Sequence, residues 1–314
     1  MTSRTYMVVD DRRDHSFRVP RPDLTAVIGT PNACAICHAD LEPAAAVAAI
    51  DGWREPRSGQ RTHYAEAIAA ARRGFANDRL REVAGNDDYP GIVRATAVSL
   101  LAQPFGSKEF LLLESELGSP DPQDRIAALR QVRPLPPEMR MRLPGARLLA
   151  DPVRGVRIEA AAAYAGLSDL LPLEEARAYG VAAAEFRSAY EFLASRPDAL
   201  IALATFEAAE GNVNEAIRVY EHALRIEPRA VTARANLADV FRSLGEEGRA
   251  EGLLLEGLEL DENNAALRHA LGLSYVRSGR PEEALVELRR AAKLAPDNPR
   301  FAYVLAIALK SLGQ

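Results

Sequence analysis

The chain has 314 residues and a formal net charge of −5, and only 6% of its residues are aromatic. A net negative charge without a basic stripe does not predict a nucleic-acid-binding surface. No apolar run reaches the roughly 18 residues that a membrane-spanning helix needs, so we expect no membrane span. Abundant alanine and few aromatic residues favour closely packed helices over sheets. We therefore predict a mainly α protein with two or three domains.

The N-terminal stretch, residues 4–31, is predicted to be extended and irregular. A short apolar run, Tyr6–Val9, precedes a charged turn, and Pro20 and Pro22 follow. Proline fixes φ and removes a backbone donor, so a regular helix is not expected around these two residues.

Residues 34–38 read Cys-Ala-Ile-Cys-His, and their two cysteines are the only ones in the chain. C-x-x-C-H is the attachment motif of c-type haem. Two thiols at this spacing can each form a thioether to a vinyl group of one porphyrin, and the adjacent imidazole can reach the iron. We therefore predict that Cys34 and Cys37 bind haem c covalently and that His38 is an axial iron ligand.

Two other interpretations of the motif stay open. A zinc site could use Cys34, Cys37, His38 and His15 as four ligands, and an inert pair of thiols is the simplest alternative. A redox C-x-x-C motif is not expected, because no parallel-sheet pattern surrounds it.

Two histidines are candidates for the sixth coordination position of the iron. His15 lies in the proline-rich loop, and His63 lies at the start of a helix that Thr62 is predicted to cap and that extends to Phe75. The alternative for each is an ordinary surface histidine. An earlier helix is expected from Ala44 to Trp53.

Three segments around the motif carry a resemblance to a known family: Thr5–Asp10, Asp14–Leu24 and Gly29–Cys34. They resemble bacterial multihaem c-type cytochromes that carry C-terminal tetratricopeptide repeats, and the resemblance extends over essentially the whole chain. It implies that His38 is a haem ligand and that His15 is a candidate distal ligand. In that family further C-x-x-C-H motifs precede the matching segment, and this sequence has none upstream.

The N-terminus, Met1–Tyr6, has no apolar signal core. Covalent haem attachment in bacteria takes place outside the cytoplasm, so we expect the chain to be a fragment of a longer, secreted precursor. The predicted location is periplasmic or extracellular if haem is attached and cytoplasmic otherwise.

Residues 77–172 show a weak internal repeat, in which Arg94, Arg125 and Arg157 are spaced by 31 and 32 residues and each follows an Asp and a Pro. This pattern resembles HEAT repeats. We interpret the three arginines as links between helices and not as a substrate site. The region before them, residues 1–76, is the predicted haem-binding domain.

Residues 173–314 repeat with a period of 34, which is typical of tetratricopeptide repeats. The period connects Gly211, Gly245, Gly279 and Gly313, and it also connects Leu203, Leu237, Leu271 and Leu305. Residues 174–195 are predicted to form a degenerate first unit. The expected fold is thus an α-α superhelix, HEAT-like and then tetratricopeptide-like, behind a small irregular N-terminal region.

The first helix of each tetratricopeptide unit lines the concave face of such an array, and we expect this face to bind a partner protein. The residues predicted to lie on it are Asp239, Arg242, His269, Arg277 and Tyr303. The last predicted helix, around residues 303–309, is apolar on more than one face, which would suit a homo-oligomer or a further helix.

Three functional hypotheses follow. The first is an electron-transfer protein that carries haem c and whose repeats dock a redox partner or another cytochrome subunit. The second is an interaction scaffold without haem, with or without zinc. The third, a fragment of a multihaem oxidoreductase, rests on the family resemblance, because no Walker A, G-x-S-x-G, G-x-G-x-x-G or H-E-x-x-H motif supports an active site on this chain.

Overall fold

The computed structural model describes residues 3–6, 10–13, 21–32, 34–53, 63–74 and 77–312. These residues are mostly helical, as the sequence predicts, and they group into two compact units that divide between Val132 and Arg133. None of the described helices is both long and apolar enough to cross a membrane.

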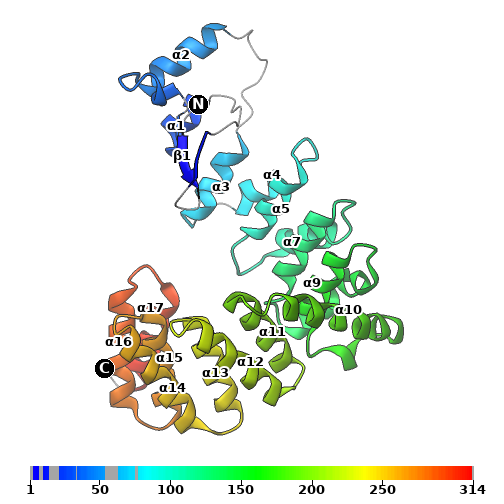
Figure 1. Ribbon diagram of the computed structural model, residues 1–314, viewed down its shortest axis with the longest axis vertical. Coiled ribbons are helices and arrows are strands. Elements are labelled where there is room, and N and C mark those ends of the chain that lie inside the picture. The colour runs from blue at the N-terminus through cyan, green and yellow to red at the C-terminus, as the bar shows by residue number, and fades with distance from the viewer. Residues whose placement is uncertain are drawn as a thin grey trace. The chain divides into compact units, whose positions relative to one another are not determined.

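The first unit contains one short hairpin, one 3-10 turn and seven helices among its described residues (Figure 1). Their bounds are β1 Ser3–Tyr6, β2 Asp10–Arg13, α1 Pro22–Ile28, η1 Cys34–Ile36, α2 Pro43–Trp53, α3 Tyr64–Arg72, α4 Asn77–Ala84, α5 Gly91–Ser99, α6 Ser107–Glu116 and α7 Pro122–Val132.

The N-terminal stretch is more regular than its sequence predicts. The strands β1 and β2 pair antiparallel, with Ser3 opposite Arg13. Pro22 does not prevent a helix but begins α1, because the first helical position needs no backbone N–H. The helix ends at Gly29, whose φ of 70° lies in the left-handed region. The irregular prediction was therefore wrong for residues 22–28.

The predicted helix-linking role of the repeated arginines is confirmed for Arg94 here and for Arg157 in the second unit. Arg94 donates to the Tyr89 carbonyl and to the Asp124 carboxylate, which connects α5 to α7. Arg125 donates to the carbonyls of Ser119 and Pro120 in the turn before its own helix. These contacts fix the turn against the helix that follows it, a structural use of arginine.

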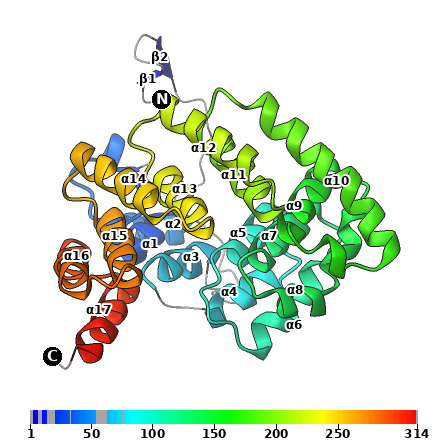
Figure 2. The ribbon, with the colours of Figure 1, turned by 90° about the horizontal axis from the view of Figure 1, so that it is seen from below.

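The second unit runs from the end of the HEAT-like segment through the 34-residue repeats, and its helices can be followed from green to red in Figure 1 and from below in Figure 2. Their bounds are α8 Pro137–Arg142, η2 Pro144–Ala150, α9 Arg154–Tyr164, η3 Ser168–Leu170, α10 Leu173–Phe192, α11 Pro197–Ala209, α12 Val213–Ile226, α13 Val231–Ser243, α14 Glu247–Leu260, α15 Ala265–Arg277, α16 Pro281–Leu294 and α17 Pro299–Ser311.

The 34-residue period has a direct structural basis. Each unit is a pair of antiparallel helices: α11 with α12, α13 with α14, and α15 with α16. The turn inside each pair contains a glycine with φ between 70° and 78°, which only glycine adopts without strain. These glycines are Gly211, Gly245 and Gly279. The predicted tetratricopeptide fold is confirmed for this part of the chain.

The predicted degenerate first unit is a single helix, α10, and not a helical pair. Its Ala182, Phe186 and Ala189 lie one period before Ala216, Tyr220 and Ala223 of α12. Phe186 is buried and stacks on Phe206 of α11, with ring centroids 4.3 Å apart. The helix α10 therefore has the role of a second helix in the repeat.

The partner of α10 on its other side is α9, which belongs to the segment predicted to be HEAT-like. Arg157 of α9 donates to both carboxylate oxygens of Glu185 on α10, at 2.8 and 2.6 Å. Arg157 also donates to the Asp151 carbonyl, in the same way as the other repeated arginines. The two repeat types thus meet through a helix pair inside the second unit, and the predicted boundaries at residues 76/77 and 172/173 remain predictions.

The same arginine contact recurs in the tetratricopeptide repeats. Arg234 and Arg268, one period apart, donate to the carbonyls of Pro228 and Glu262, at 3.1 and 2.7 Å. Both carbonyls precede the arginine by six residues, as Asp151 precedes Arg157. In each of these repeats, an arginine side chain therefore holds the inter-repeat turn against the helix that follows it.

Candidate haem motif and partner-binding surface

The C-x-x-C-H motif forms one turn of helix. The N–H groups of Cys37 and His38 both donate to the Cys34 carbonyl, at 3.2 and 2.9 Å. The turn begins where the Asn32 side chain accepts the N–H of Cys34 at 3.0 Å. Residues three and four apart are neighbours across such a turn, so Cys37 and His38 each lie next to Cys34.

Access to the three side chains is open. Cys34 is half-buried, Cys37 and His38 are exposed, and both cysteines are free thiols. This donor set and its placement fit covalent haem attachment. No three His, Cys, Asp or Glu side chains within the described ranges come together as a metal-binding group. His15, the proposed distal or fourth ligand, lies outside the described residues.

His63 does not sit free at the start of a helix, and it replaces the predicted cap Thr62. Its Nδ1 accepts the N–H of Ala65 at 3.1 Å, and its own N–H donates to Glu66 at 3.3 Å, which completes a capping box on α3. Burial and then the charge of Arg21 lower the pKa of His63. Because Nδ1 accepts, the neutral ring holds its proton on Nε2. Iron ligation through Nε2 would therefore require the loss of this cap.

Three of the five predicted partner-binding residues come together in a charge cluster, which we define as Asp239, Arg242, Glu247 and Arg277. Asp239 and Arg242 form an ion pair on α13. Arg277 Nε of α15 lies 3.6 Å from Glu247 Oε1 at the start of α14. Burial and then the charge of Arg242 lower the pKa of Arg277. The sequence reasoning missed Glu247.

His269 lies elsewhere than we predicted from its register. It is 6% exposed, and its ring stacks on Phe301 of α17 with centroids 4.5 Å apart. Among the described residues neither of its ring nitrogens has a hydrogen-bond partner. Burial and then the charge of Arg300 lower the pKa of His269, which favours the neutral ring. His269 thus packs α15 against α17 instead of lining an open surface.

Exposed apolar side chains continue the surface along the first helices. Tyr303, predicted to lie there, is 67% exposed, and Ile307 and Val276 are about half exposed. The sequence analysis did not predict Ile307 and Val276 as surface residues. Ile307 lies two periods after Asp239, and Val276 lies one period after Arg242. The same 34-residue register that selected the charged residues could therefore have identified these two apolar positions.

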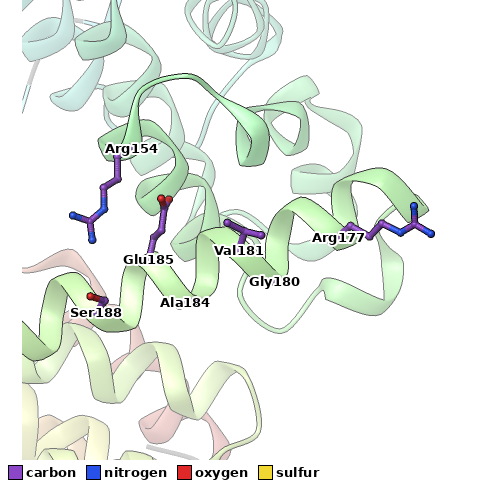
Figure 3. A pocket seen from close by; sticks show the side chains of 7 residues that line it. All are labelled: Arg154, Arg177, Gly180, Val181, Ala184, Glu185 and Ser188. Atoms are coloured by element: carbon purple, nitrogen blue, oxygen red, sulfur yellow. The ribbon is translucent and has the colours of Figure 1, made fainter.

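A broad open depression of about 750 Å³ lies on α10, and its lining is Arg154, Arg177, Gly180, Val181, Ala184, Glu185 and Ser188. Figure 3 shows Arg154 and Glu185 toward one end and Arg177 at the other. Glu185 is engaged by Arg157, whose hydrogen bond lowers its pKa. The remaining lining is mostly small, so no convergent catalytic groups meet here.

Two curated human proteins are similar to a part of this chain. Human protein O-mannosyl-transferase TMTC3 is 28% identical over 108 residues, which are 34% of this chain and 12% of that protein. Human protein O-mannosyl-transferase TMTC1 is 37% identical over 82 residues, 26% of this chain and 9% of that protein. The chain thus spans about a tenth of the length of these two curated relatives.

Similar solved structures have low identity to this chain. The first tetratricopeptide domain of Spaghetti (RPAP3) bound to an HSP90 peptide is 19% identical, with a TM-score of 0.34, and the match covers 38% of this chain and 94% of that one. The Yersinia enterocolitica secretion chaperone SycD with a YopD peptide is 17% identical, with a TM-score of 0.34, over 37% and 91%. The Thermus thermophilus protein TTC0263 is 20% identical, with a TM-score of 0.33, over 74% and 99%.

A family model described as tetratricopeptide repeat matches residues 167–314. This range begins just before α10 and includes all four first helices, α11, α13, α15 and α17. It agrees with the 34-residue register, the glycine turns and the second-helix role of α10. Residues 167–314 are therefore tetratricopeptide repeats.

Proposed function

We propose that the protein is an interaction scaffold whose tetratricopeptide repeats bind a segment of a partner protein. The observation that carries this proposal is a run of solvent-accessible side chains: the charge cluster, formed by the first helices α13 and α15 with Glu247 of α14, and then the apolar Val276, Tyr303 and Ile307 of the first helices. Apolar anchors beside charged groups are a common composition of polypeptide-binding surfaces. The partner segment would present apolar and charged side chains together.

The test uses peptides selected from a random displayed library on the purified chain. Binding of each selected peptide is measured by fluorescence anisotropy for the parent, Arg277→Ala and Tyr303→Ala. We expect each change to weaken binding by about tenfold, a loss of about 1.4 kcal/mol. The matched control is Leu255→Ala, an exposed residue of the second helix α14. Peptides that bind all variants equally would refute a first-helix site.

A second candidate function, haem-dependent electron transfer, is favoured by the helical turn of residues 34–38. Cys34 and Cys37 would hold haem c through thioethers, and His38 would be an axial ligand. The bound iron would supply ferrous–ferric electron exchange. The repeats would then dock a redox partner, and the protein would work outside the cytoplasm. Zinc on the same thiols is the minor alternative.

Expression with an export signal, in a host that matures c-type cytochromes, tests this candidate. The denatured protein is examined by its alkaline pyridine spectrum, with a known cytochrome expressed in parallel. A c-type band at one haem per chain, lost in Cys34→Ala/Cys37→Ala, supports attachment. A colourless product beside a coloured control rejects it, and zinc content is then measured on the same protein.

A further inference from the structure

A cavity of about 390 Å³ in the first unit is lined by the start of α3 and by one face of α4 with the turn after it. The lining from α4 and its turn is Arg79, Glu82, Val83 and Asn86. Their spacings of three, four and seven residues from the first place them on the same helix face. His63 and Ala67 line the cavity from α3, and Tyr89 completes the lining. The volume suits a small molecule.

Two of the lining side chains are oriented by backbone hydrogen bonds, and in both the remaining nitrogen is a donor. The Nδ1 atom of His63 accepts the N–H of Ala65 at 3.1 Å, so the neutral ring carries its proton on Nε2. The Oδ1 atom of Asn86 accepts the N–H of Asp88 at 3.0 Å, which leaves the Nδ2 group to donate. The cavity therefore offers N–H donors from both of its sides.

Arg79 and Glu82 add one positive and one negative charge to the same lining. They are three residues apart, and at this spacing and in this order Arg280 and Glu283 form an ion pair of 2.5 Å. In the described part of the chain, neither Arg79 nor Glu82 has an ion-pair partner within 4.0 Å. A ligand can therefore pair with both charges without breaking an existing ion pair.

The rest of the lining is apolar, and aromatic contacts hold its polar walls. Ala67 is 4% and Val83 6% exposed. The ring of Tyr64 contacts the rings of both His63 and Tyr89, with centroids 4.1 and 5.5 Å apart. These contacts position the two walls before a ligand binds, which lowers the entropic cost of binding.

We propose that this cavity binds a small aliphatic α-amino acid in its zwitterionic form. The ligand carboxylate accepts hydrogen bonds from Arg79, His63 and Asn86, and the ligand ammonium group donates to Glu82. The apolar lining receives the aliphatic side chain. A simple anion matches less well because Glu82 repels it, and a simple cation is repelled by Arg79. The site lies in the first unit and does not depend on the partner-binding surface proposed for the repeats.

The probe is L-alanine, titrated into the purified chain by isothermal titration calorimetry. Propionate, which lacks the ammonium group, and ethylamine, which lacks the carboxylate, are titrated in the same way. We expect saturable binding of L-alanine and binding of each analogue that is weaker by at least about tenfold, because one charge of the cavity then stays unpaired. Equal or tighter binding of either analogue, or no saturable binding of L-alanine, would overturn the proposal.

Two substitutions separate the roles of the charged side chains. Arg79→Ala should weaken L-alanine binding by at least about tenfold and reduce the preference for L-alanine over ethylamine. Glu82→Gln should weaken it by a similar factor and reduce the preference over propionate. Both residues are exposed, so neither change opens a core cavity, and circular dichroism checks the fold.

The matched controls are Arg72→Ala and Glu114→Gln, which remove the same charges at exposed positions outside the cavity lining. Both control variants should bind L-alanine normally. Binding that persists unchanged in Arg79→Ala or in Glu82→Gln, or that falls equally in the controls, contradicts the proposal. His63 is left unchanged because its side chain also caps α3.

Discussion

The C-x-x-C-H turn and the tetratricopeptide array specify structure in opposite ways. In the turn, two backbone hydrogen bonds to one carbonyl align three accessible side chains, and little packing surrounds them. In the array, the defining residues are small or apolar, buried, and distributed at intervals of 34. A change in the turn should therefore alter chemistry and leave stability almost intact, whereas a change in the array should do the reverse.

The largest expected effect is on the array. Phe186→Ala removes a fully buried ring that stacks on both Phe206 and Tyr190, and it should lower the free energy of unfolding by about 3–5 kcal/mol. The matched change in the same helix, Phe192→Ala, affects a ring that is 88% exposed and should shift stability by less than about 0.5 kcal/mol. Urea denaturation measures both, and similar losses would contradict the second-helix role of α10.

The next effect concerns a buried carboxyl group in the first unit. Burial, and then the charge of Asp124, raise the pKa of Glu116 from 4.5 to about 7. The folded state favours the protonated form of Glu116. The contribution of this group to the free energy of unfolding is therefore full below pH 4.5 and is lost as the pH rises through about 7. This contribution amounts to about 3 kcal/mol, at 1.36 kcal/mol per pKa unit. Glu116→Gln should flatten the stability profile between pH 4.5 and 7.5, and an unchanged slope would contradict this assignment.

For His269 in the second unit, stability should change with pH in the opposite direction. Its folded pKa is lowered below 6.5, so its contribution is full above pH 6.5 and is lost as pH falls below that value. We expect His269→Leu to reduce the loss of stability on acidification, measured by urea denaturation at pH 5 and pH 7. If the variant and the parent lose the same stability between these pH values, His269 does not titrate as proposed.

A smaller effect tests close helix packing. Gly272→Leu inserts a side chain against Leu288 and should destabilise the array by about 1–3 kcal/mol. Gly180→Leu, on the exposed side of α10 with no atom within 4 Å of an added Cβ, should stabilise by about 0.5–1 kcal/mol through helix propensity. The midpoint of thermal unfolding should move in opposite directions for the two variants. The same direction for both would mean that helix propensity, and not contact with α16, decides the outcome at residue 272.

The smallest effect is expected in the turn. Cys37→Ser replaces an exposed thiol and should change the free energy of unfolding of the haem-free chain by less than about 0.5 kcal/mol. The same substitution should remove one thioether when the protein is matured with haem, which mass spectrometry detects. A large loss of stability without haem would show that the turn is a packing element, and the comparison with the array would then fail.

Much of the fold can be predicted from the sequence because the patterns that specify it are local or periodic. The glycine turns, the buried leucines at 34-residue intervals and the helix-linking arginines all recur in fixed register, and each repeat interacts mainly with its neighbours. The cysteine spacing likewise determines which side chains share one turn. These features need only the chain direction and helical geometry, so they could be predicted without tertiary structure.

Other features were decided only by which helix lies opposite a given residue. His269 shares its register with the exposed Tyr303, yet it is buried because Phe301 of α17 stacks on it. His63 caps α3 because its ring folds back on Ala65. The helix α10 packs as a second helix because it lies between α9 and α11. Burial and hydrogen bonding depend on contacts between distant segments, and a one-dimensional pattern does not contain them.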